Sequence, residues 1–175
     1  AALLDLVKRH RVTKLATAPT AYKAMLGLLG DADISSLRTC VSAGEHLPAS
    51  TWHAWHEATG LRIIDGIGAT EMMHIFISAS GDDIRPGATG KPVPGYVAAV
   101  LDEQDRPMAS GTGCLAINGP TGCRYFDDER QATYVRGGWN VTGDTYRKDE
   151  DGYYWYVARS DDMIVSSGYN IAAPE

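Results

Sequence analysis

The chain has 175 residues, of which 44% are hydrophobic, and its net charge is −6 at neutral pH with a pI near 5.3. This apolar content is enough for a folded core, and the length allows one ordinary domain or slightly more. No cluster of Lys or Arg offsets the acidic charge, so we expect neither nucleic acid nor an anionic membrane as a partner.

The start of the chain shows no basic leader, and its apolar runs are too short to span a bilayer. The three cysteines, Cys40, Cys114 and Cys123, are odd in number and widely spaced, which favours reduced thiols. Together these features predict a cytoplasmic protein that does not contact membranes.

Short apolar runs alternate with helical patterns up to about residue 80. The expected helices cover residues 2–9, 19–29 and 48–60, and the expected strands cover 14–18, 38–42 and 61–65. Pro19 and Pro48 suit first helical turns, and Gly30 suits a helix end. This alternation predicts βαβ units around a mostly parallel sheet.

Glycine and proline become frequent after Gly81, and short β-rich runs follow at 96–101, 114–117, 139–142 and 153–157. Such runs are typical of a small antiparallel barrel or sandwich. We therefore predict an α/β fold in three parts. Part of a parallel α/β subdomain (1–80) precedes a small antiparallel β-barrel subdomain (81–158), and residues 159–175 form the hinge and start of a C-terminal domain.

Three segments join a glycine-bearing turn to groups that can hold a nucleotide. The first, Asp65–Glu71, reads Asp-Gly-Ile-Gly-Ala-Thr-Glu and follows a predicted strand, where ligands bind in an open α/β sheet. Its glycines allow close approach of the backbone. Thr70 can donate to a phosphate oxygen, and Glu71 can hold Mg²⁺, which prefers carboxylates and phosphates.

The second segment, Asn140–Asp144, reads Asn-Val-Thr-Gly-Asp, and the third spans 158–171. Asp144 can accept two hydrogen bonds from a ribose diol, and Arg159 can reach a ribose or phosphate. Each segment also has an ordinary interpretation: a helix N-cap at Thr70, a β-turn aspartate, and a surface ion-pair cluster. The occurrence of all three segments in this order favours a nucleotide-binding site over these ordinary interpretations.

The ordered motifs resemble those of the adenylate-forming superfamily, which contains acyl-CoA synthetases, luciferases and peptide-synthetase adenylation domains. The family patterns are Tyr-Gly-x-Thr-Glu, Thr-Gly-Asp and Gly-Arg-x-Asp-Asp-x-Ile-x-x-x-Gly. The resemblance covers essentially all of this chain but only the middle of a full-length enzyme. Residues 67–78 and 90–96 look like benzoate-type CoA ligases, and 119–125 and 160–174 look most like 2-aminobenzoate–CoA ligases.

The resemblance implies that the parent protein is an AMP-forming aryl-CoA ligase, an acid–thiol ligase of aromatic degradation. It would activate an aryl carboxylate with ATP as aryl-AMP and transfer the acyl group to CoA. The implied small molecules are therefore the aryl acid, ATP/AMP, Mg²⁺ and CoA. A homodimer is left open as the assembly.

The resemblance also implies roles for individual residues. Thr70 and Glu71 would be catalytic, at the α-phosphate and as the Mg²⁺ ligand respectively. The implied nucleotide-binding set is Gly44, Glu45, His46, Asp65, Gly66, Ile67, Gly68, Thr70, Asp144 and Arg159. The implied substrate pocket is Tyr22, Ala43, Gly68 and His74. Asp161 would be the hinge residue, and Gly168 would line the CoA channel.

Some residues keep two interpretations. Tyr22 fits the acid pocket or the core equally well, and His74, one helical turn after Thr70-Glu71, fits a pocket or a buried histidine. His53 and His56 have a spacing that can bind metal but fit a solvated helix face better.

No phosphate loop with its lysine precedes these motifs, and no lysine follows Lys148. We therefore expect a fragment that is inactive by itself. One alternative is a medium-chain fatty acyl-CoA synthetase with the same mechanism. Another, from a different class, is a non-catalytic module that binds a nucleotide or a partner.

Overall fold

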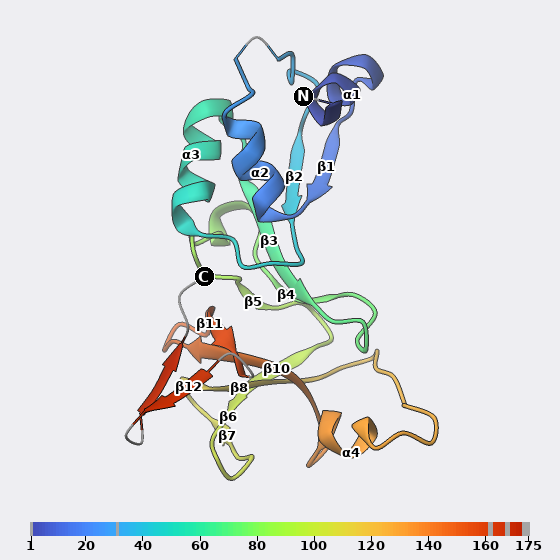
Figure 1. The fold of residues 1–175 in the computed structure, drawn as a ribbon, viewed down its shortest axis with the longest axis vertical. Coiled ribbons are helices and arrows are strands. Elements are labelled where there is room, and N and C mark those ends of the chain that lie inside the picture. The colour runs from blue at the N-terminus through green and yellow to red at the C-terminus, as the bar shows by residue number, and fades with distance from the viewer. Residues whose placement is uncertain (1, 31, 161–162, 167–168, 173–175) are drawn as a thin grey trace. The chain divides into compact units, whose positions relative to one another are not determined.

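The computed structural model describes residues 2–30, 32–160, 163–166 and 169–172, the last two ranges as backbone only (Figure 1). Asp161 and Gly168, predicted as the hinge and CoA-channel residues, lie outside the described residues. The chain forms two compact units, one of residues 1–67 with 78–90 and the other of residues 68–77 with 91–175. The division into 1–80, 81–158 and 159–175 stays a prediction.

The first unit contains the expected βαβ pattern. In chain order it holds α1 (Ala2–His10), β1 (Lys14–Thr17), α2 (Pro19–Leu26), β2 (Thr39–Ser42), α3 (Ala49–Thr59), β3 (Ile63–Gly68) and the 3-10 helix η1 (Gly81–Asp83). Strand β2 pairs in parallel with both β1 and β3, with Cys40 opposite Leu15 on one side and Ile63 on the other. The predicted parallel sheet is therefore confirmed.

Helix ends in this unit follow the glycines, with one difference from the prediction. Helix α3 ends at Gly60, whose positive φ of 71° suits glycine and whose N–H donates to His56 O at 2.8 Å. Helix α2 stops at Leu26 instead of Leu29. Gly27 caps the helix. A helix continued to Leu29 would contain Gly27, and a glycine inside a helix costs backbone entropy; Gly30, the predicted helix end, lies only three residues later.

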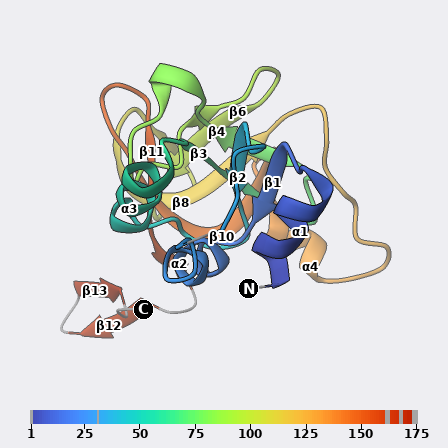
Figure 2. The same ribbon diagram turned by 90° about the horizontal axis from the view of Figure 1, so that it is seen from above.

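Aromatic side chains of α2 and α3, which lie side by side (Figures 1 and 2), fill the core of the first unit. Tyr22 and Trp55 are fully buried and meet edge to face at 4.8 Å between ring centroids. Trp52 packs against the sheet and donates from Nε1 to the Ile63 carbonyl at 2.9 Å. Burial of aromatic rings that keep a polar partner stabilises this layer and fixes the helices against the strands.

The second unit is β-rich, as predicted. Its elements are β4 (Ile75–Ser78, with Ser78 itself in the first unit), β5 (Lys91–Pro92), β6 (Val97–Leu101), β7 (Pro107–Met108), β8 (Gly111–Asn118), α4 (Arg130–Tyr134), β9 (Val135–Arg136), β10 (Trp139–Lys148), β11 (Tyr154–Arg159), β12 (Met163–Ser166) and β13 (Tyr169–Ala172). The main sheet has the order β11-β10-β8-β6-β7, with β9 paired to β10.

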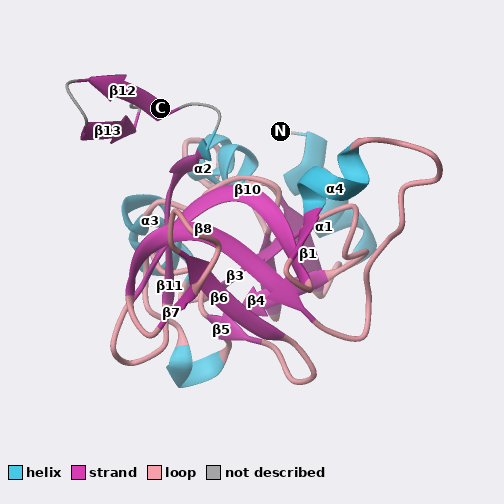
Figure 3. Ribbon diagram, turned by 90° about the horizontal axis from the view of Figure 1, so that it is seen from below, coloured by secondary structure: helices cyan, strands magenta, loops and turns pink. Residues whose placement is uncertain are grey.

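This antiparallel sheet curls into a half-barrel (Figure 3). Its interior contains small and medium side chains, including Ala99, Leu101, Ala116 and Val141. Tyr154 is buried and donates its hydroxyl to the Ala98 carbonyl at 2.6 Å. The mixed α/β fold with a parallel-containing sheet and a curled antiparallel sheet agrees with the predicted class.

Strand β10 is longer than its sequence pattern indicates. The expected run of 139–142 continues to Lys148, so Gly143 and Asp144 lie inside a strand and not in a terminal turn. Register shifts accompany this segment in both pairings of β10, as β-bulges do. The bulged backbone accommodates Gly143 at φ +76° without ending the strand.

Gly113 in β8 tests how tightly the half-barrel packs. A Cβ at this position would lie 2.1 Å from the Leu101 carbonyl oxygen, a backbone atom that cannot move aside. We expect Gly113→Ala to lower the free energy of unfolding by about 2 kcal/mol, as overpacking does. Urea unfolding of the protein measures this change.

Gly122→Ala is the matched control, because its nearest neighbour would be the Asn140 side chain at 3.8 Å. Its unfolding free energy should stay within about 0.5 kcal/mol of the parent. Equal stability of the two variants would contradict the tight packing of β8 against β6.

Candidate active site

In the first unit, the loop that follows β2 contacts the start of α2. Glu45 accepts from the backbone N–H and the hydroxyl of Thr20, each at 3.4 Å. A carboxylate at a helix N-terminus satisfies free N–H groups and interacts favourably with the helix dipole. Glu45, which is predicted to bind the nucleotide, therefore lies beside the start of α2, the helix that carries Tyr22 of the predicted substrate pocket. Gly44 and Glu45 are exposed, and Ala43 and His46 are partly buried.

Asp65 lies in β3 directly opposite Ser42 of β2, near the carboxyl ends of both strands. Its Oδ1 is buried and has no hydrogen-bond partner among the described residues. Burial raises the pKa of the Asp65 carboxyl to about 7, although the Gly66 N–H and the nearby Ser42 hydroxyl oppose the shift. A buried acceptor without a partner is a place where a ligand donor could bind.

The Asp65 backbone is also fixed, because the Ser78 hydroxyl donates to its carbonyl at 2.6 Å. Gly66 is buried and Ile67 is partly buried on the same strand. In the first unit, the residues predicted to bind the nucleotide thus lie at the end of β3 and in the loop that follows β2.

The turn that carries Thr70 and Glu71 belongs to the second unit. Residues 69–73 form two consecutive turns, with the N–H groups of Met72 and Met73 donating to the carbonyls of Ala69 and Thr70. The predicted alternative of a helix with Thr70 as its N-cap is wrong, since the chain passes from this turn into β4. Met73 has φ +64°, a left-handed conformation that breaks a helical path.

Gly68 makes this turn sterically possible. A Cβ on Gly68 would lie 2.7 Å from the carbonyl oxygen of His74, which would force the turn open. His74 is exposed, and its Nδ1 lies 3.2 Å from the Ile75 carbonyl. The interpretation of His74 as a buried histidine one helical turn after Thr70 is therefore wrong.

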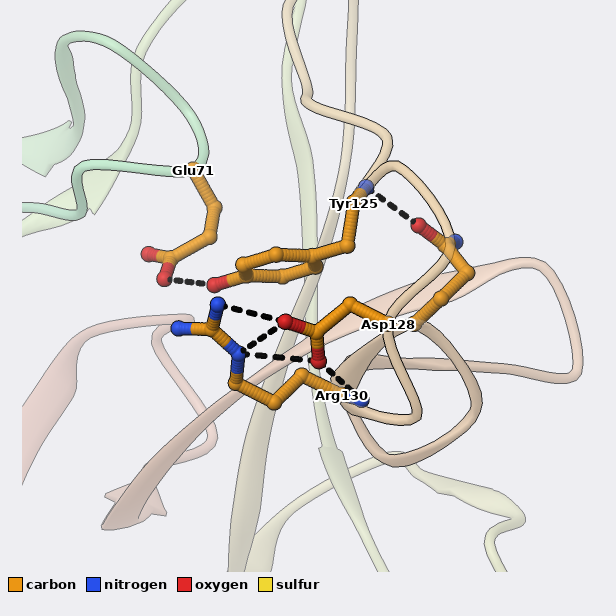
Figure 4. A network of polar contacts seen from close by, with 5 residues as sticks. Glu71, Tyr125, Asp128 and Arg130 are labelled. Carbon is orange, nitrogen blue, oxygen red and sulfur yellow. Dashed lines mark hydrogen bonds and ion pairs between the residues drawn. The ribbon is translucent and has the colours of Figure 1, made fainter.

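Glu71 has a partner that the sequence analysis missed. Its Oε1 accepts from the Tyr125 hydroxyl at 2.6 Å, across 54 residues of sequence (Figure 4). This bond raises the pKa of Tyr125, because ionised Tyr125 would lose the proton that Glu71 accepts. Tyr125 closes the segment 119–125 that carries the 2-aminobenzoate-ligase resemblance, so its position in the motif was the only available signal.

Asp144 and Arg159 face each other across the β10–β11 hairpin. They are register partners, and Arg159 Nη1 lies 3.4 Å from Asp144 Oδ1. The Asp144 side chain is 13% exposed and the Arg159 side chain 49%. The guanidinium also lies over Gly143, where a Cβ would be 3.6 Å from Nη2. The second and third motifs therefore meet on adjacent strands.

Tyr22 lies in the core of the first unit. The sequence left open whether it belongs to the core or to the acid pocket. Its hydroxyl lies 3.1 Å from the Leu15 carbonyl and 3.0 Å from the Val41 carbonyl. His56 packs against Trp52 with 5.1 Å between ring centroids. Within the described part of the chain, no three His, Cys, Asp or Glu side chains gather as a metal site requires.

Glu71 nevertheless fits a magnesium ion that arrives with a nucleotide. Mg²⁺ in such sites uses one or two carboxylates together with phosphate oxygens and water, and needs no complete protein cage. Glu71 is partly buried, and only one of its oxygens accepts from Tyr125. The donor set of the turn suits a metal–phosphate complex better than a resident metal.

A family model described as "AMP-binding enzyme" matches residues 1–125 of the chain. The chain belongs to this family. None of the described helices is long and apolar enough to cross a membrane.

The chain is similar to individual CoA ligases and acyl-CoA synthetases. The chain is 37% identical to the benzoate–CoA ligase of Thauera aromatica, covering 100% of the chain and 34% of the ligase. It is 38% identical to the mitochondrial acyl-coenzyme A synthetase ACSM3 of Mus musculus, covering 97% of the chain and 31% of the synthetase. The structure of the anthranilate CoA ligase AuaEII in complex with anthranoyl-AMP matches with a TM-score of 0.92 and 44% identity, covering 98% of the chain and 34% of the ligase. The chain thus spans about a third of the length of these relatives.

Asp65 should make stability depend on pH. Its pKa of about 7 in the fold lies above the ordinary value of 3.8, so the folded protein binds more protons than the unfolded chain between these values. The stabilising contribution of protonated Asp65 is complete below pH 4 and is lost as pH rises through 7. Relative to Asp65→Asn, the unfolding free energy of the parent should fall by about 2 kcal/mol between pH 5 and 8, a value discounted for partial contact with solvent.

Denaturant unfolding at several pH values measures this difference. Asp127→Asn removes an exposed carboxylate and should leave the pH profile of the parent in place. Parallel profiles for Asp65→Asn and the parent would show that burial does not govern this carboxyl.

Proposed function

We propose that this chain is the central part of an AMP-forming aryl-CoA ligase of the benzoate or 2-aminobenzoate type. The observation that carries the proposal is its 44% identity, over 98% of its length, to an anthranilate CoA ligase solved with anthranoyl-AMP. An aryl-AMP is the intermediate expected when an aromatic carboxylate is activated by ATP. The 37% identity to a benzoate–CoA ligase supports the same class of acid.

The chemistry explains why these residue types are needed. A carboxylate is a poor electrophile. Attack of its oxygen on the α-phosphorus of ATP releases pyrophosphate and gives an acyl-AMP, from which AMP is a good leaving group. The protein then has to orient the acid against the α-phosphate and neutralise the negative charge that accumulates there. In this proposal Thr70 donates its hydroxyl to the α-phosphate, and Glu71 holds Mg²⁺. The cation supplies positive charge at the phosphate oxygens.

We assign the ribose to Asp144 and Arg159 of the second unit. Asp144, whose Oδ1 lies 3.4 Å from Arg159 Nη1, is the carboxylate that would accept from the two ribose hydroxyls in this proposal. Arg159 is half-exposed and can add a contact to the ribose. In the first unit Asp65, Gly66 and Ile67 on β3 and residues 44–46 of the neighbouring loop would contact adenine, whose amino group suits the unpaired Asp65 oxygen.

The acid would contact small residues and one histidine. The residues proposed for it are Ala43 of the first unit and Gly68 of the second, both small, together with exposed His74, which offers a polar ring group. Tyr22 is retained in this proposal as the residue that supports the pocket wall from the core, because its hydroxyl bonds to the backbone of β1 and β2. Such a lining favours a flat, partly polar acid over an alkyl chain.

The second step needs parts of the parent protein beyond these residues. We propose that Asp161 is the pivot for a domain rotation and that Gly168 lines the channel for CoA, so that the acyl group transfers to the thiol. A cytoplasmic location and a homodimer stay predictions. The 38% identity to the mitochondrial acyl-coenzyme A synthetase ACSM3 supports an acyl-CoA synthetase as the second candidate, which the sequence analysis expects to act on medium-chain fatty acids.

Carboxylate-dependent exchange of pyrophosphate into ATP tests the function in the complete protein that contains this chain. The panel is benzoate, 2-aminobenzoate, phenylacetate and hexanoate. We expect exchange with an aryl acid, and a loss of about 100-fold or more in Glu71→Gln, because the charge that holds the cation is removed. The amide oxygen of glutamine can still accept from Tyr125, so the variant should fold.

Two controls separate the alternatives. Asp127→Asn neutralises an exposed carboxylate and should keep the parent rate. Exchange with hexanoate alone would replace the aryl assignment with the medium-chain one. Exchange with no acid would leave a non-catalytic binding module as the better description.

A further inference from the structure

We propose that Tyr125 is a positioning residue for Glu71, which fixes the carboxylate so that one oxygen faces the incoming Mg²⁺–nucleotide complex. This inference rests on the proposed function, because it assigns the cation to Glu71. Tyr125 belongs to a segment, 119–134, that contains none of the residues assigned to the nucleotide, the acid or CoA. The contact that carries it is the 2.6 Å hydrogen bond from the Tyr125 hydroxyl to Glu71 Oε1 (Figure 4).

Glu71 needs an external partner because its own segment gives it little support. It lies on consecutive turns and not on a helix or strand, so no regular neighbour restricts its side chain. A free glutamate loses rotamer entropy when it binds a ligand in one orientation. A hydrogen bond formed before the ligand arrives removes part of this loss.

The geometry of the bond leaves the carboxylate able to bind a cation. An ionised carboxylate has two oxygens and about four acceptor positions. Tyr125 occupies one position on Oε1. The remaining positions, including those on Oε2, have no hydrogen-bond partner in the described ranges and can bind Mg²⁺. Ligating carboxylates in metal sites are commonly hydrogen-bonded in this way.

Tyr125 is itself held from three sides. Its backbone N–H donates to Gln131 Oε1 at 2.8 Å, and the Arg130 guanidinium lies 4.5 Å from its ring centroid. The Tyr134 ring meets it edge to face at 6.1 Å. A tyrosine fixed at its backbone and on its ring can transmit that fixed position to Glu71.

Arg130 is held in turn by Asp128. Its Nε lies 3.0 Å from both oxygens of Asp128, and its Nη2 lies 2.6 Å from Oδ2. An exposed ion pair of this kind contributes little to stability. Its planar, two-pronged geometry does fix the orientation of the guanidinium over the ring, so its value here is positional.

The test compares the complete protein with Tyr125→Phe, using α,β-methylene-ATP as the probe and calorimetry as the readout. The nucleotide affinity is measured with and without Mg²⁺, and the ratio of the two affinities isolates the metal contact. Loss of a hydrogen bond to a metal ligand should reduce this ratio about tenfold. The metal-free affinity should stay unchanged, because Tyr125 does not contact the nucleotide in this proposal.

Tyr134→Phe is the matched control. It removes a hydroxyl from the other ring of the same pair, and that hydroxyl is buried and has no hydrogen-bond partner among the described residues. This variant should keep the parent ratio. Asp128→Asn should shift the ratio in the same direction as Tyr125→Phe but by less, because it loosens the ring without removing the hydroxyl.

A kinetic measurement separates positioning from folding. In Tyr125→Phe the Mg²⁺ concentration for half-maximal pyrophosphate exchange should rise about tenfold, and saturating Mg²⁺ should restore the parent rate. A defect in folding would not be rescued by the cation.

The outcomes distinguish this inference from the proposed function. A Tyr125→Phe protein with the parent ratio would overturn the inference and leave the function in place. So would an equal loss in Tyr125→Phe and Tyr134→Phe, which would indicate disturbed packing. A parent protein that binds no nucleotide, or binds it equally with and without Mg²⁺, would overturn the metal role of Glu71 and the inference with it.

Discussion

The close approach of Gly68 to the carbonyl of His74 determines the shape of the loop that carries Thr70 and Glu71. The 2.7 Å that would separate a Cβ from His74 O leaves room for hydrogen only. Because the chain can fold back at this point, residues 69–73 form two tight turns before the chain continues into β4. A side chain at position 68 would open the turn and move Glu71 away from Tyr125. One steric condition on the backbone thus governs the orientation of the carboxylate.

The alternation of helical and strand patterns made the fold of the first unit predictable from the sequence. The three helices and three parallel strands of the first unit follow from apolar periodicity, Pro19 and Pro48 at helix starts, and Gly60 at a helix end. Helix α4 and the two-residue strands β5, β7 and β9 had no such pattern, since elements this short have no detectable period. The length of β10 was missed because Gly143 signals a turn in sequence, although antiparallel neighbours and a bulge hold it in a strand.

Local motifs identified several candidate site residues, but not the contacts that these residues make in the fold. Asp144 and Arg159 were named from motifs, but their pairing depends on the register of β10 with β11, which side-chain identity does not reveal. Tyr125 reaches Glu71 across 54 residues, and a long-range contact of this kind leaves no local signal. His74 was placed by assuming a helix after Glu71, and the positive φ of Met73 shows why that assumption was wrong.

Three carboxylates of the chain have different environments, and each environment suits a different task. Asp65 is partly buried and its Oδ1 has no hydrogen-bond partner among the described residues. Its pKa of about 7 leaves it only part protonated near neutral pH, so it can exchange its proton for a ligand's donor group. Asp144 lies 3.4 Å from the guanidinium of Arg159 on the next strand, and in the proposed function it accepts from the ribose hydroxyls. Glu71 accepts from a neutral phenol, which orients it without cancelling its charge. A cationic partner at Glu71 would compete with a metal ion for the same charge, whereas a tyrosine hydroxyl leaves that charge available.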